Sequence, residues 1–210
     1  MKDKLNKFSV PLGLLDYINP IFYTITMVTI ISKNYVLMKT PYNVILLIGA
    51  IISIFFGFII PTGKVMVGLG IIKFRMPVSL VFCVNTGILL SGLMLLKYFL
   101  RISSNTLITI AAIIVVVLIL MFIKSKKFNT VAVLTGAFGY MIIYVSLIFF
   151  AIIENIVLSV ILYDIAIILF VMLCGIGIKA DLKNPKIHWV IEISNVICQG
   201  LVAFATITLF

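Results

Sequence analysis

Apolar residues are concentrated in seven long runs, which proline residues and short polar stretches separate. A hydrocarbon core about 30 Å thick requires about 20 apolar residues in a helix that crosses it. Each run is close to that length. The pattern therefore predicts seven transmembrane helices, at residues 19–38, 43–60, 77–99, 105–123, 129–152, 156–178 and 187–209.

The segment 61–76 is the weakest part of this prediction, because it is mostly apolar but begins with Pro61. Two interpretations are open. We favour a loop that lies on the membrane. The other is that the second helix continues past a kink at Pro61, which would place Lys64 inside the edge of the membrane. The segment 8–17, which lies before the first predicted helix, has too few apolar residues to span the membrane. We expect a short interfacial helix there.

Composition excludes a soluble domain of this size. The chain has 210 residues, of which 64% are hydrophobic and 10% are charged, and its mean hydropathy is +1.35. A soluble globule has to present a more polar surface to water. Seven helices leave room only for short connections. We therefore expect one all-α transmembrane domain, residues 1–210, in the cell membrane with the lipid bilayer around it.

The net charge of +10 follows the predicted topology. Twelve Lys and Arg residues fall before the first helix and in the loops between helices 2 and 3, 4 and 5, and 6 and 7. The opposite side holds four: Lys33, Lys39, Lys97 and Arg101. By the positive-inside rule this split predicts a cytoplasmic N-terminus and an extracytoplasmic C-terminus. The basic residues are then topology determinants, and we expect no nucleic-acid partner.

An internal repeat is indicated by a recurring order of small, basic, proline and amide residues. Segment 68–73, followed by Pro77 and Asn85, matches segment 175–179, followed by Pro185 and Asn195. This predicts two parallel three-helix units joined by one helix. The units would be 19–100 and 128–210, and the joining helix 105–123. The alternative is chance, because Gly and Pro are common at helix ends.

Two further features bear on this plan. The helix 105–123 is almost uniformly aliphatic, which predicts a peripheral position. The arrangement of three, one and three helices resembles that of the SWEET sugar transporters and of the vitamin transporters of the PnuC type. The resemblance covers the architecture alone. No proline–glutamine pair occurs in the chain, so the resemblance assigns no residue to a site.

Polar side chains inside the predicted helices mark the candidate site, because an ionisable group there costs about 2.5–3.5 kcal/mol. Asp164 is predicted near the membrane midplane, and Glu192 nearer the inner face. His188, Glu192, Asn195 and Gln199 are spaced i, i+4, i+7 and i+11, which places them on one helix face. We expect a substrate-binding cavity lined by Asp164, Glu192, Asn195, Gln199, Tyr140 and Asn85. We expect proton coupling through Asp164, Glu192 and His188.

Simpler roles are open for several of these residues. The amides can hydrogen bond between helices. Glu192 can pair with Lys183 or Lys186, and His188 can be solvated at the interface. The three cysteines form no CxxC motif and the chain has one histidine, so we expect no metal or cofactor.

Function is therefore predicted only as a class. We expect a transporter of a small polar or cationic solute, coupled to protons through a buried carboxylate. One alternative is a non-transporting membrane subunit, with a partner, immunity or sensor role, that binds another membrane protein or an ATPase. The other is an intramembrane lipid-modifying enzyme that uses Glu192 and His188. No catalytic motif accompanies these two residues, so the chain is not assigned as an enzyme.

Overall fold

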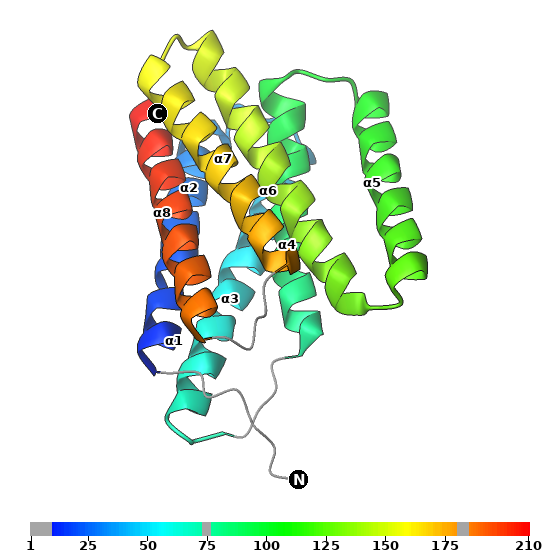
Figure 1. The fold of residues 1–210 in the computed structure, drawn as a ribbon. Helices are drawn as coiled ribbons and strands as arrows, with labels where there is room; N and C mark the ends of the chain where they lie inside the picture. The colour runs from blue at the N-terminus through cyan, green and yellow to red at the C-terminus, as the bar shows by residue number, and fades with distance from the viewer. Residues whose placement is uncertain (1–9, 73–76, 180–184) are drawn as a thin grey trace.

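A computed structural model describes residues 10–72, 77–179 and 185–210, with the side chains of residues 176–179, 185, 186 and 188 left out. All the regular elements in these ranges are helices (Figure 1). They are α1 (Val10–Asp16), α2 (Ile18–Asn34), α3 (Tyr42–Gly68), α4 (Val78–Phe99), α5 (Ser104–Ser125), α6 (Phe128–Ile153), α7 (Val157–Lys179) and α8 (Pro185–Leu209).

Seven helical segments in the described residues are long and apolar enough to cross a membrane, with α1 and α2 counted as one segment. This confirms the predicted all-α membrane protein with seven such helices. Successive helices alternate in direction (Figure 1), so that α2, α4, α6 and α8 all run away from α1. We call the two ends of the bundle the α1 end and, opposite it, the Phe210 end.

Helix α3 corrects the prediction for the segment 61–76. The helix continues through Pro61 as far as Gly68, so the loop interpretation is wrong for residues 61–68 and the alternative of a continued helix is right there, whereas residues 73–76 lie outside the described residues. Proline only removes the hydrogen bond to the carbonyl of Gly57, and the apolar residues around it continue to pack as a helix. Lys64 therefore lies inside a helix that is long and apolar enough to cross a membrane.

Helix α1 also differs from its prediction as an interfacial helix. It leads directly into α2 through a single turn residue, Tyr17. It packs against α3 and α8, and it buries Leu12, Gly13 and Asp16. It is thus part of the bundle, and its last residue, Asp16, is a buried carboxylate.

Small residues bring α3 and α4 into close contact. A Cβ atom added to Gly49 would lie 2.8 Å from the carbonyl oxygen of Gly87 and 2.8 Å from Oγ of Ser91. A Cβ atom added to Gly87 would lie 2.6 Å from the carbonyl oxygen of Gly49. Such small-residue faces let transmembrane helices pack backbone against backbone. The two glycines are therefore required by the packing of this helix pair.

Six of the described helices form a ring. Helix α3 packs on both α2 and α4, and the ring continues as α4 packs on α6, α6 on α7, α7 on α8, and α8 on α2. Within the described residues, the backbones of α3 and α8 do not approach each other. In the described part of the chain, the backbone of α5 approaches only α4 and α6, and the helix buries only Leu107 and Ile114. It stands at the edge of the bundle (Figure 1), as its aliphatic sequence predicts.

Candidate functional site: a buried ion cluster between three helices

Lys64 of α3 contacts two carboxylates that come from two other helices. Its Nζ lies 2.6 Å from Oδ2 of Asp16, at the end of α1. The same Nζ lies 3.2 Å from Oε1 of Glu192, on α8. Asp16 and Glu192 are 8% and 9% exposed, so the charges interact largely out of contact with solvent. A buried charge is tolerated when it is paired and hydrogen-bonded in this way.

Asn19, at the start of α2, connects the two carboxylates. Its Nδ2 donates to Oδ1 of Asp16 at 3.3 Å and, more weakly, to Oε2 of Glu192 at 3.5 Å. Its own Oδ1 is buried and accepts no hydrogen bond within the described part of the chain. A buried acceptor without a donor is uncommon. The cluster of Asp16, Asn19, Lys64 and Glu192 thus has a spare acceptor beside its two carboxylates.

The local sequence explains how these side chains meet. Asp16, Asn19 and Tyr23 are spaced i, i+3 and i+7 along the nearly continuous α1–α2 helix, so they share one face. Because α3 continues past Pro61, Lys64 reaches the same level. Glu192 lies seven residues into α8, about 10 Å from its start at 1.5 Å per residue. The cluster therefore lies inside the α1 end of the bundle.

A series of buried polar groups continues from the cluster toward the Phe210 end. Ser53 Oγ donates to the Tyr23 hydroxyl at 3.1 Å. The rings of Tyr23 and Tyr140 meet edge to face with centroids 6.2 Å apart. Gln199 Nε2 donates to the Tyr144 hydroxyl at 3.2 Å. These contacts place tyrosines and an amide between α2, α6 and α8, on the side of the cluster that faces the centre of the bundle.

Nearer the Phe210 end, α7 and α8 are joined by two hydroxyl pairs. The Tyr163 hydroxyl lies 2.9 Å from Thr206 Oγ1, and Ser159 Oγ lies 2.8 Å from Thr208 Oγ1. Tyr163, Ser159 and Thr206 are each 0% exposed. Hydrogen bonds of this kind hold transmembrane helices together at about 0.6 kcal/mol each. We regard these two pairs as packing contacts.

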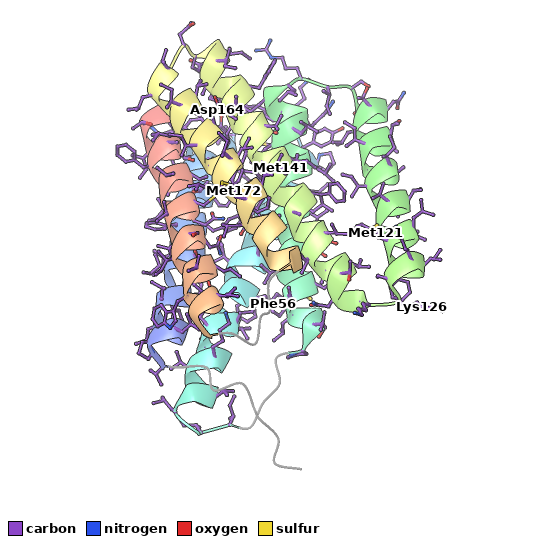
Figure 2. All side chains as sticks on the ribbon, in the orientation of Figure 1. Phe56, Met121, Lys126, Met141, Asp164 and Met172 are labelled. Carbon is purple, nitrogen blue, oxygen red and sulfur yellow. The ribbon has the colours of Figure 1, made fainter. Side chains whose placement is uncertain are left out.

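The structure does not bring Asp164 together with the other residues of the predicted cavity. Its side chain is exposed, and no hydrogen bond or ion pair reaches it from the described residues. It lies on the exposed face of α7 with Ile161, Ile165, Ile168 and Met172. Figure 2 shows Asp164 and Met172 along the same helix. Its role in binding and proton coupling stays a prediction.

The other predicted residues lie at several depths. Glu192 is in the cluster, and Gln199 and Tyr140 belong to the polar series beyond it. Asn85 Nδ2 donates to the carbonyl of Ala132 at 2.7 Å, which joins α4 to α6. Asn195 is half-buried on α8 between Glu192 and Gln199. The His188 side chain lies outside the described residues.

Asp16 and Lys64 are the two charged residues of the cluster that sequence reasoning did not select. Asp16 precedes the first predicted helix in the sequence, so the search for ionisable groups inside the predicted helices does not include it. Lys64 could have been identified from the sequence, because the kinked-helix interpretation of the segment after Pro61 places it inside a helix. Glu192 was selected, but its predicted partners were Lys183 and Lys186, which lie wholly or in their side chains outside the described residues.

Chemically, the cluster can bind a cation or exchange protons, because it combines two carboxylates with one ammonium group in a poorly solvated place. No group of three His, Cys, Asp or Glu side chains that could hold a metal ion occurs in the parts of the chain described. Comparison of the chain with protein-family models, with curated proteins and with solved structures finds no match.

Proposed function

We propose that the protein is a transporter of a small cationic or polar solute, and that the Asp16–Lys64–Glu192 cluster closes the inner end of its path. The observation that carries the proposal is the bridge that Lys64 makes from α3 to Glu192 on α8, two helices whose backbones do not approach each other in the described residues. An ion pair between otherwise separate helices can break without disturbing a packed interface. A cationic solute can replace Lys64 at one of its two carboxylates.

The buried polar groups beyond the cluster support a path for a solute. Ionisable side chains inside a membrane protein are costly, and they commonly mark solute or proton pathways. Tyr23, Tyr140 and Gln199 continue the polar lining toward the centre of the bundle. Proton coupling is proposed for the same cluster, because its two carboxylates share one cation and a proton can take the place of Lys64 at either of them.

The helix neighbours support the predicted repeat of two three-helix units. In one unit α3 packs against both α2 and α4, and in the other α7 packs against both α6 and α8. Between the units, α4 packs on α6 and α8 packs on α2. Exchanging the two units reproduces this set of contacts, as expected for a parallel repeat with a solute path between its halves. We propose on the charge distribution that the α1 end is cytoplasmic.

Binding is tested first, with purified full-length protein in detergent and its thermal unfolding as the readout. The compounds are methylammonium, choline, putrescine, thiamine, glucose and magnesium chloride. We expect one or more of the organic cations to raise the melting temperature of the wild-type protein, and glucose to leave it unchanged. Glu192→Gln should abolish the response, whereas the matched variant Glu154→Gln, at an exposed position outside the cluster, should keep it.

Transport is then tested in proteoliposomes that contain a pH-sensitive dye, with a gradient of the cation that binds. Uptake with a change of internal pH is the expected result, and Asp164→Asn is included to test the separate prediction for that residue. If no compound stabilises the wild-type protein, or if Glu192→Gln responds as the wild type does, the proposed site is wrong.

A second function, as a membrane subunit that binds another membrane protein, is favoured by the position of Asp164. An unpaired carboxylate on an exposed apolar face of a transmembrane helix is unfavourable unless a partner supplies a cation or a donor. A partner helix with Lys or Arg at that depth would satisfy it. Copurification of a second membrane protein or an ATPase with the wild type, and its loss in Asp164→Leu, would support this function over the first.

A further inference from the structure

The Phe210 end of the bundle contains a basic pocket of about 570 Å³. It lies between the connection from α2 to α3, the end of α4 and the start of α5. Three cationic side chains line it, namely Lys39, Lys97 and Arg101. Its lining contains no acidic residue. A volume in this range suits a small ligand or a lipid headgroup.

The three cations have no carboxylate partner within the described residues, where both ion pairs belong to Lys64. Lys97 is held in place by other contacts. Its Nζ donates to the carbonyl of Ile102 and lies 5.5 Å from the centre of the Tyr42 ring. Cations that converge without a counter-charge create a positive potential, which an anion can neutralise.

Hydroxyl groups complete the pocket. The Tyr42 hydroxyl lies 2.7 Å from Ser104 Oγ, so that the start of α3 is joined to the start of α5. Both residues line the pocket together with the cations. Guanidinium, ammonium and hydroxyl donors around one cavity are the groups that bind phosphate oxygens in proteins. The chemistry of the lining therefore favours a ligand with an anionic phosphate group over a neutral ligand.

The charge distribution adds an independent reason. Only four of the Lys and Arg residues in the sequence fall at this end, and three of them line this one pocket. Basic residues at the end predicted to be extracytoplasmic work against the topology signal, so their concentration in a single cavity calls for another role.

The surroundings of the pocket favour a lipid as the source of the phosphate. Leu37, in its lining, is 67% exposed, and the neighbouring Val36 is 92% exposed. On the other side, Ile108 lies one turn along α5 from Ser104 and is 65% exposed. Acyl chains can cover these apolar side chains while the headgroup occupies the cavity.

We propose that this pocket binds the phosphate group of an anionic phospholipid, with Arg101 and Lys39 as its main ligands and Lys97 fixed behind them. The site is independent of the ion cluster, which lies at the opposite end of the bundle. Binding between basic side chains at a helix end is the usual way in which membrane proteins recognise anionic headgroups.

The test measures lipid binding to the full-length protein in detergent by native mass spectrometry, with phosphatidylglycerol and phosphatidylcholine as probes. The variant Lys39→Gln/Arg101→Gln removes two cations but leaves Lys97 and its contacts. The matched control is Lys33→Gln, which removes the fourth basic residue at the same end, outside the pocket. We expect the double variant to lose about tenfold in affinity for phosphatidylglycerol, the equivalent of about 1.4 kcal/mol, and the control to match the wild type.

Competition by glycerol 3-phosphate and by inorganic phosphate distinguishes the two sources of the anion. We expect neither to displace phosphatidylglycerol at millimolar concentration. The proposal is overturned if the double variant binds phosphatidylglycerol as the wild type does, or if phosphatidylcholine binds equally well. It is also overturned if a soluble phosphate displaces the lipid, because the pocket is then a site for a soluble anion.

Discussion

Lys64 and Glu192 form a 3.2 Å ion pair across two helices, α3 and α8, whose backbones do not approach each other within the described residues. The same ammonium group lies 2.6 Å from Asp16 on α1. Lys64 thus connects α3 to α1 and to α8 at the α1 end of the bundle. The predictions that follow concern this contact first, and then the packing, the orientation and the lipid-facing surface of the bundle.

Replacing Lys64 with methionine should destabilise the protein by about 3 kcal/mol, because it leaves two buried carboxylates close together without their cation. The measurement is thermal unfolding of the detergent-solubilised protein, followed by loss of the monodisperse peak in size-exclusion chromatography. Lys127→Met, at an exposed position between α5 and α6, is the matched control and should be within about 0.5 kcal/mol of the wild type.

Removing Glu192 together with Lys64 should cost less than the sum of the two single changes. The double variant Lys64→Met/Glu192→Met leaves no unpaired partner on α8, and a coupling energy of about 0.5–3 kcal/mol is expected for residues in contact. Additive effects in this double-mutant cycle would show that the ion pair does not form in the protein.

Adding one methyl group at Gly49 or Gly87 should destabilise the protein by about 1–3 kcal/mol through overpacking. The reason is that a Cβ atom at Gly49 would lie 2.8 Å from the Gly87 carbonyl oxygen. Gly175→Ala is the matched control, since a Cβ atom there meets nothing within 4 Å. Equal melting temperatures for Gly49→Ala and Gly175→Ala would contradict the close packing of α3 on α4.

The orientation of the chain is tested at the two ends of α6, where Lys127 and Glu154 are both exposed. In a variant without native cysteines, Glu154→Cys should react with a membrane-impermeant maleimide in intact cells. Lys127→Cys should react only after the membrane is permeabilised, because the charge distribution predicts a cytoplasmic α1 end. The reverse pattern of labelling would mean that the N-terminus is extracytoplasmic.

Replacing Asp164 with leucine should stabilise the purified protein by about 2 kcal/mol, because the change removes an exposed carboxylate from an apolar helix face. Asp164→Asn should give a smaller gain, since the amide is still polar. Thermal unfolding in detergent measures both effects. A loss of stability in Asp164→Leu would show that the carboxylate interacts within the chain and would strengthen its predicted role in the solute site.

The helices were predictable because hydropathy over about 20 residues depends little on what the segment packs against. The end of α3 was not, because the loss of one backbone hydrogen bond at Pro61 is a cost that tertiary packing overcomes. The peripheral place of α5 followed from its uniform aliphatic composition. The neighbours of α8 could not be read from the sequence, since its polar face shows only that some partner exists.

The candidate site was predictable from the sequence only in part. The spacing of Glu192, Asn195 and Gln199 identified the inward face of α8. Asp164 was selected by depth alone, and depth does not distinguish the face of α7 that meets α8 from the face that meets lipid. Lys64 depended on the path of the chain after Pro61, so its pairing with Asp16 required the three-dimensional structure.

The close contact of Gly49 with Gly87 has a mechanical consequence. Two backbones that meet without intervening side chains share a close interface, so we expect α3 and α4 to move together. A change of shape that opens the α1 end must then carry both helices away from α8 together. At that end, the described residues link this pair of helices to α8 through the ion pair of Lys64 with Glu192 and through α1, which packs on both α3 and α8.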